Sequence, residues 1–206
     1  MPTVPAATAA GSRENKKLTL QHPFQRLPNS IKKGAFLGLG ALTLVLLVIL
    51  NRLNTPLTTP AAPSGIISFE LAGELSRTEA ILESWGDTAN IHAGFSLGLD
   101  YLFLVSYASF IALGCVLGAQ TFPPGGLLAL VGVFLAWLQF GAAVLDSVEN
   151  FALIRLLLGD RHEGWPIVAR WCALPKFAIV GAGAAYILLG AVAKVTKSPG
   201  TGEHSS

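Results

Sequence analysis

The chain has 206 residues, enough for one domain or at most two. Its residues are 52% hydrophobic and only 13% charged, with a mean hydropathy of +0.58, whereas an ordinary soluble domain carries about 25% charged residues. This deficit of charge indicates membrane-spanning segments. The net charge of +2 argues against nucleic-acid binding. Two cysteines exclude a disulfide-rich secreted scaffold and a four-cysteine zinc site.

Stretches without Asp, Glu, Lys or Arg mark the predicted membrane spans, and they cover residues 34–51, 101–145 and 177–193. A membrane helix needs about 20 mainly apolar residues, so the middle stretch is long enough for two helices. The segment Pro-Pro-Gly-Gly at 123–126 supplies the turn between them, because proline cannot continue a helix and glycine permits the reversal.

The sequence therefore predicts an all-α fold, a four-helix transmembrane bundle with a short extracytoplasmic helix in the first loop. The predicted membrane domain, residues 34–195, has helices at about 34–51, 93–122, 125–158 and 174–195. Residues 34–50 are interpreted as an uncleaved anchor, because the 33 residues before them are too many for an ordinary signal peptide. A cleaved signal remains the alternative.

The first loop, residues 52–92, is the largest predicted soluble segment. It begins with a proline-rich spacer, and residues 65–73 are predicted to be extended. Ser76 and Glu79 match a capping box, which predicts a short helix over 77–85 that ends at Gly86. The two tails, residues 1–33 and 196–206, are predicted to be disordered because they contain too few apolar residues to bury.

The basic first tail sets the predicted orientation. Residues 1–33 contain six Lys and Arg residues against one Glu, which by the positive-inside tendency places this tail in the cytoplasm. Four spans then return the C-terminus to the same side. Over the whole chain the bias is weak, with eight basic residues inside and six outside. The expected location is a membrane that the chain crosses several times, with both termini cytoplasmic.

Three charged residues flank the apolar stretches. Asp100, Asp146 and Lys176 all lie at the outer ends of their helices in the predicted topology. Glu149 and Asn150 follow Asp146 by three and four residues, so the three side chains share one helix face. The sequence therefore predicts that these five residues form a polar cluster at the outer leaflet.

His92, at the outer end of the helix that carries Asp100, completes the candidate cluster. Ionisable groups at membrane depth are functional-site candidates. Paired carboxylates can act as acid and base or bind a hard cation. The alternative is structural: the acids pair with Lys176 or Arg170 and hold the helices in register. The structural interpretation is favoured, because charge is inexpensive at headgroup level, where water is near.

Other chemical motifs are absent from the sequence. There is no P-loop, G-x-S-x-G, H-E-x-x-H or C-x-x-C, and the four histidines are scattered, so no metal and no cofactor are predicted. Cys115 and Cys172 are predicted to lie too far apart for a disulfide and are interpreted as small packing residues. Gly114-x3-Gly118 matches the small-residue motif for close helix packing, although the chain has 22 glycines.

Four features occur in a recognisable order. Phe69-Glu70-Leu71-Ala72 precedes Trp85-Gly86, Asp100-Tyr101-Leu102-Phe103 begins a long helix, and Asp146-Ser147-Val148-Glu149-Asn150 ends the next. In this order the chain resembles a group of small bacterial integral membrane proteins with four predicted helices. The resemblance covers about residues 66–195. It implies a multi-pass protein of the bacterial inner membrane and brings no established activity.

Two functions remain open at this stage. The first is a non-enzymatic accessory or scaffold bundle, favoured because no catalytic motif is present. The alternative is a lipid- or cation-handling membrane enzyme or transporter that uses the acidic cluster. Expected partners are membrane lipids, other membrane proteins or a second copy of the chain, and not nucleic acid. An enclosed cavity touching the cluster favours the alternative, whereas ion pairs that fill the space favour the scaffold.

Overall fold

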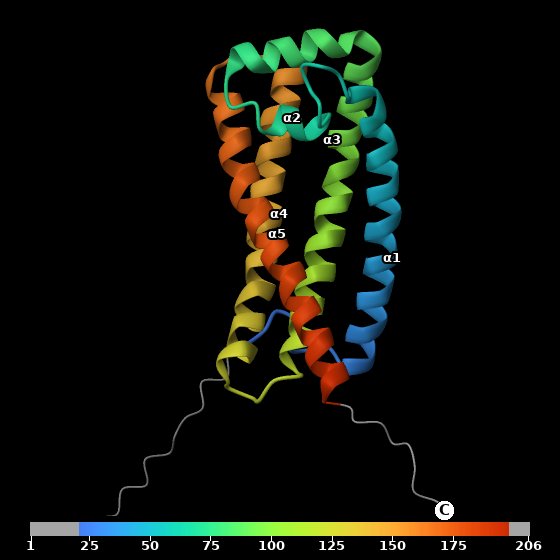
Figure 1. Cartoon of the computed structure of the whole chain (residues 1–206), viewed down its shortest axis with the longest axis vertical. Coiled ribbons are helices and arrows are strands. Elements are labelled where there is room, and N and C mark those ends of the chain that lie inside the picture. The colour runs from blue at the N-terminus through green and yellow to red at the C-terminus, as the bar shows by residue number, and fades with distance from the viewer. Residues whose placement is uncertain (1–20, 198–206) are drawn as a thin grey trace, which may run out of the picture.

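The computed structural model describes residues 21–197, and this part of the chain contains helices and no strand. Four long helices run side by side, with the short helix α2 at one end and both ends of the described chain at the other (Figure 1). We call these the α2 end and the termini end. The elements are α1 (Asn29–Asn54), the 3-10 turn η1 (Thr55–Leu57), α2 (Ile66–Glu70), α3 (Leu75–Ala119), α4 (Leu127–Leu157) and α5 (Gly164–Thr196).

The predicted all-α class is confirmed. Helices α1, α3, α4 and α5 are each long and apolar enough to cross a membrane. Helix α3 packs against all three of the others, and α4 also packs along α5. The reversal predicted at residues 123–126 joins α3 to α4, where Gly125 has a φ of 77° that favours glycine.

Three helices begin earlier than predicted, and one of them, α3, begins at Leu75 instead of 93. Helix α5 begins at Gly164 instead of 174, because Pro166 lies in the first turn, where its missing N–H is not needed. Helix α1 begins at Asn29, so residues 29–33 of the predicted disordered tail are helical. Residues 21–28 of the same predicted tail contain a turn, and Thr196 of the second predicted tail ends α5. Residues 1–20 and 198–206 lie outside the described part of the chain.

The first loop also differs from its prediction. Residues 66–70, expected to be extended, form α2, and the capping box does not form. Glu74 precedes α3, so Ser76 lies inside the helix, because Gly73 (φ 73°) turns the chain two residues earlier than expected. The segment 77–85 is not a separate helix but the first part of α3. It lies across the α2 end and bends into the bundle at Gly86, whose φ of 61° favours glycine (Figure 1).

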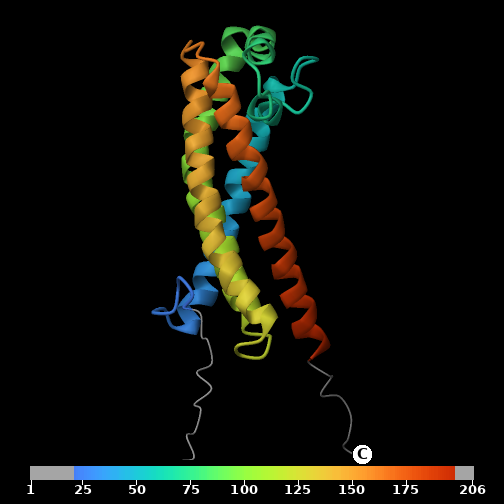
Figure 2. The same ribbon diagram turned by 90° about the vertical axis from the view of Figure 1, so that its left-hand side faces the viewer.

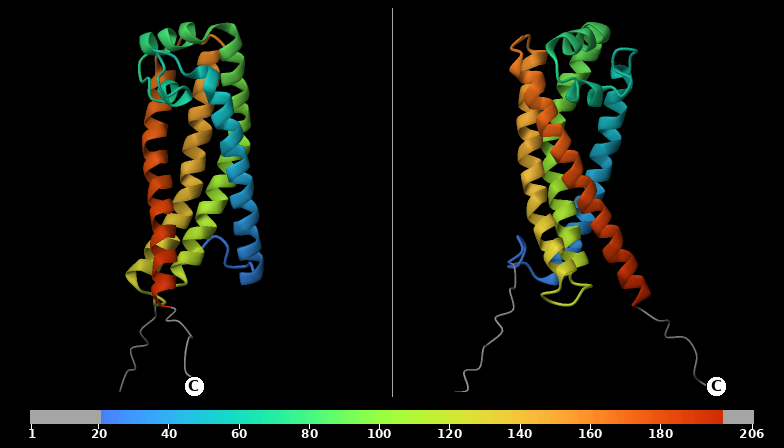
Figure 3. Two further views of the ribbon diagram at one scale, coloured as in Figure 1. Left: turned by 45° about the vertical axis from the view of Figure 1, so that its right-hand side comes forward. Right: turned by 60° about the vertical axis from the view of Figure 1, so that its left-hand side comes forward.

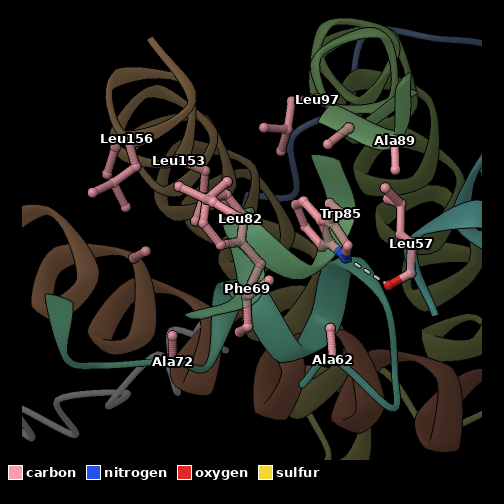
Figure 4. Close-up of a cluster of buried hydrophobic side chains, with 14 residues drawn as sticks. Leu57, Ala62, Phe69, Ala72, Leu82, Trp85, Ala89, Leu97, Leu153 and Leu156 are labelled. Atoms are coloured by element: carbon pink, nitrogen blue, oxygen red, sulfur yellow. Dashed lines mark hydrogen bonds between the residues drawn. The ribbon is translucent and has the colours of Figure 1, made fainter. Parts of the chain in front are cut away.

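Buried apolar side chains at the α2 end attach this crossing segment to the bundle. Trp85 donates its indole N–H to the carbonyl of Leu57 at 2.7 Å and packs edge-on against Phe69, with the ring centroids 5.2 Å apart (Figure 4). Leu153 and Leu156 of α4 close the same cluster. The α2 end therefore has its own hydrophobic core, which fixes α2 against the long helices.

Helices α3 and α5 approach closely near the termini end. A Cβ atom added at Gly190 would lie 2.9 Å from the Cα of Gly118, so this approach requires glycine at position 190. A Cβ atom added at Gly118 would lie 3.9 Å from the Cα of Gly190, which is ordinary contact. Figures 2 and 3 show that the same half of α5 leans away from α4. Gly118 is part of the Gly114-x3-Gly118 motif of α3, and the helix that packs against it is α5.

We expect Gly190→Ala to lower the melting temperature of the purified protein in detergent, because the new methyl group meets backbone that cannot rotate away. Overpacking of this kind costs about 1–3 kcal/mol. Gly181→Ala is the matched control on the same helix, since nothing lies within 4 Å of its added Cβ. Equal melting temperatures for the two variants would contradict the close approach.

Candidate functional site

Lys176 of α5 lies inside the bundle, with its side chain 8% exposed. Its Nζ atom is 2.7 Å from Oε2 of Glu149 and 3.0 Å from Oδ1 of Asp146, both on α4. Oε2 of Glu70 on α2 is 3.9 Å away. The ring of Phe177 lies 4.6 Å from the same nitrogen. One buried cation therefore joins α2, α4 and α5.

Two hydrogen bonds attach α3 to the same group of side chains. The hydroxyl of Tyr107 donates to Oδ2 of Asp146 at 2.8 Å. Asn150 of α4 donates from Nδ2 to Oδ2 of Asp100 at 2.6 Å. We call this set the buried polar network, and its members are Glu70, Asp100, Tyr107, Asp146, Glu149, Asn150 and Lys176.

The structure brings together five of the six residues that the sequence places in the cluster. The sixth, His92, lies eight residues before Asp100, about 12 Å along α3. Within residues 21–197 it makes no hydrogen bond or ion pair with the network.

Sequence reasoning missed two members of the network. Tyr107 carried a signal, because it lies seven residues after Asp100 and so shares its helix face. Glu70 carried none, because its position depends on how the first loop folds back over the bundle.

The network contains four carboxylates and one lysine. Glu149 is fully buried, and in the described chain its Oε1 atom has no hydrogen-bond partner. No lysine, arginine or histidine of residues 21–197 forms an ion pair with Asp100. Burial raises the pKa of the Glu70 carboxyl to about 7, although Lys176 opposes the shift. Glu70 therefore changes its charge near neutral pH.

The depth of the network follows from helix lengths. Asp146 lies 19 residues after the start of α4, and Lys176 lies 20 residues before the end of α5, or about 28 and 30 Å at 1.5 Å per residue. The hydrocarbon core of a bilayer is about 30 Å thick. The exposed residues Arg155 and Arg170 lie about 9–14 Å farther toward the α2 end. If the hydrocarbon core begins at the termini end of the helices, it therefore extends as far as the network and ends before these two arginines.

A cavity of about 310 Å³ opens between α1, α2 and α3, beside the network. Its polar wall comes from six side chains: Asn51, Asn54, Glu70, Ser96, Asp100 and Asn150. Its apolar wall comes from five side chains: Leu47, Leu50, Ile66, Ile67 and Leu97. Such a wall can hold a positively charged group that carries an apolar chain.

The described part of the chain has no cluster of potential metal ligands. Among residues 21–197, no three His, Cys, Asp or Glu side chains have an arrangement suited to a metal ion. Cys115 and Cys172 are both free thiols, and Cys115 is buried among apolar neighbours.

Comparisons with protein-family models, with curated proteins and with solved structures give no match for this chain. The fold defines the class of the protein: an all-α protein with four helices long and apolar enough to cross a membrane. Its function must be inferred from the buried polar network and the cavity beside it.

We expect Lys176→Met to destabilise the protein strongly, because it leaves three carboxylates facing one another without a cation. Breaking a buried ion pair in this way costs about 3–5 kcal/mol. Thermal unfolding in detergent measures the loss. Adding Asp146→Asn and Glu149→Gln to the same chain restores part of it, since two of the three carboxylates around the lost cation are then neutral.

The control is Arg155→Met at an exposed pair, where Arg155 lies 2.7 Å from Asp160. Exposed pairs contribute about 0–1 kcal/mol, so this variant unfolds close to the parent temperature. A loss for Lys176→Met no larger than for this control would show that the network does not hold the bundle together.

Proposed function

We propose that this chain is an integral membrane protein that crosses the bacterial inner membrane four times, with both termini in the cytoplasm. The four long apolar helices and the position of both described ends at one end of the bundle support an even number of spans (Figure 1). Lys33 and Lys194 lie at the termini end, as the positive-inside tendency requires of a cytoplasmic face. The α2 end then faces the outside.

We further propose that the cavity between α1, α2 and α3 binds the positively charged head of an amphiphile from the outer leaflet. The observation that carries this proposal is the cavity wall, in which two carboxylates, Glu70 and Asp100, meet an apolar surface. The network has three more carboxylates than lysines, so a ligand cation lowers the cost of the buried negative charge.

The ligand class follows from the shape and chemistry of the wall. The one side-chain hydrogen bond that Asp100 accepts from the described residues is the neutral one from Asn150, so its second oxygen can accept from a ligand N–H. Leu47 and Leu50 face the cavity from α1 and suit an alkyl chain. An alkylammonium group, free or in a lipid headgroup, matches both parts.

Binding is proposed instead of catalysis because of how the acids are held. Asp146 and Glu149 share Lys176, which occupies the position that a proton-transfer partner would need. The wall residues with acid–base capacity are Glu70 and Asp100, and the hydroxyl beside them is Ser96. This set can position a cation but lacks the paired nucleophile and base of a hydrolytic site.

The second candidate function is the accessory or scaffold bundle. One observation favours it: most polar atoms of the network pair with each other and link α2, α3, α4 and α5. In that case the network only holds the helices in register, and the partners are other membrane proteins or a second copy of the chain.

A ligand titration separates the two candidates. Binding of n-decylammonium to the detergent-purified protein should raise its melting temperature, because a ligand of the folded state stabilises it, and n-decanol should have little effect. Asp100→Asn should weaken apparent affinity for the amine about tenfold, or about 1.4 kcal/mol.

The matched control for this titration is Asp87→Asn, an exposed acid on the same helix. It should leave the affinity unchanged. Equal responses to amine and alcohol, or equal affinities of the Asp100 and Asp87 variants, would refute the binding proposal and leave the scaffold.

The affinity for n-decylammonium should rise between pH 6 and pH 8. Glu70, with its pKa raised to about 7, is mostly protonated at pH 6 and mostly ionised at pH 8, while the ammonium stays charged throughout. Lys176, Asp100, Asp146 and Glu149 also face Glu70, and the Glu70→Gln variant keeps all four, so the comparison of the two chains over the same pH range isolates Glu70. Glu70→Gln should remove the rise. A wild-type affinity that is constant with pH contradicts the role of Glu70.

The orientation is tested by labelling with a membrane-impermeant thiol reagent in intact cells. In a chain with Cys115→Ala and Cys172→Ala, we expect Thr58→Cys to react and Pro124→Cys to remain unlabelled until the cells are opened. Both positions are exposed and lie at opposite ends of the bundle. The reverse labelling pattern would invert the topology.

A further inference from the structure

A second cavity, of about 590 Å³, lies at the termini end, between α1 and α5 and against the end of α3. Three lysines line it: Lys33 of α1, Lys194 of α5 and Lys197, the residue after α5. Lys197 donates to the carbonyl of Thr121 at 2.7 Å, which holds its ammonium group at the mouth of the cavity. We call this cavity the basic cleft.

No acid of the described chain balances these lysines. Every Asp and Glu between residues 21 and 197 falls within 70–163, on the elements of the α2 end or at the network. In residues 21–197 none of the three lysines forms an ion pair. Among residues 21–197 the basic cleft is therefore a site of positive charge without a counter-charge, and an anion is its complementary ligand.

The basic cleft continues into an apolar groove of about 220 Å³ that runs along the helices. The two cavities share Phe36, Leu117, Thr121 and Lys194, so the lysines lie at the end of the groove. Gly118 and Gly190 leave its floor without side chains. The groove lies in the half of the bundle where α5 leans away from α4 (Figure 2).

We infer that the basic cleft and its groove bind one anionic phospholipid, with the phosphate at the lysines and an acyl chain in the groove. The apolar groove beside the charge favours a lipid over free phosphate as the source of the anion. Basic pockets between membrane helices on the cytoplasmic side recognise such headgroups. The inference rests on the proposed membrane topology but not on ligand binding in the cavity at the α2 end.

Native mass spectrometry of the full-length protein in detergent tests the inference, with dioleoylphosphatidylglycerol and dioleoylphosphatidylcholine as probes. We expect the anionic lipid to bind more tightly. Lys33→Gln with Lys194→Gln should weaken its binding about 25-fold, or about fivefold per lysine. Lys197 is left unchanged because of its bond to Thr121. The matched control, Arg52→Gln with Arg77→Gln, removes the same charge at the α2 end and should leave the affinity unchanged.

Three results would overturn the inference: equal binding of the two lipids, equal loss in the two double variants, or full displacement of the lipid by inorganic phosphate. Dimerisation that is lost with the lysines and unaffected by lipid would assign the basic cleft to a second copy of the chain. Asp100→Asn should leave the binding of the anionic lipid unchanged. The proposals for the two sites are therefore tested independently.

Discussion

The structure depends on one buried cation. Lys176 places a charge in the interior of an apolar bundle, where an unpaired ion costs several kcal/mol, and three carboxylates from α2 and α4 surround it. Because Asp146 also accepts from Tyr107, the same charge fixes α3. Any rotation of α5 about its axis would separate Lys176 from its partners, so this interaction sets the register of the helices.

The network also explains why the first loop folds as it does. Glu70 reaches Lys176 only because α2 turns back over the bundle, and the apolar contacts of Phe69 and Trp85 hold it there. The favourable free energy of hydrophobic burial thus offsets the cost of bringing a fourth carboxylate into the interior. The resulting excess of negative charge is what makes the adjacent cavity suited to a cation.

The two ends of the bundle have opposite electrostatic character. Acids gather at the α2 end and in the network, while the termini end of the described chain is basic. The same helices therefore present an acidic cavity at one depth and the basic cleft about 25 Å away. The two proposed ligands, an amphiphile with a positive head and a phospholipid with a negative head, are complementary to different ends, so the two proposals are compatible with each other.

Composition and the spacing of charges were sufficient to predict the helical class, the α3–α4 reversal and five members of the network, because these features follow from local periodicity and from the length a helix needs to cross a bilayer. Helix starts at Asn29 and Gly164 were missed, since charged and proline residues are tolerated in a first helical turn. Only the tertiary structure decided that Glu70 joins the network, that His92 does not, and that Gly118 meets Gly190. Those contacts depend on how segments distant in sequence pack, and a one-dimensional pattern carries no information on that packing.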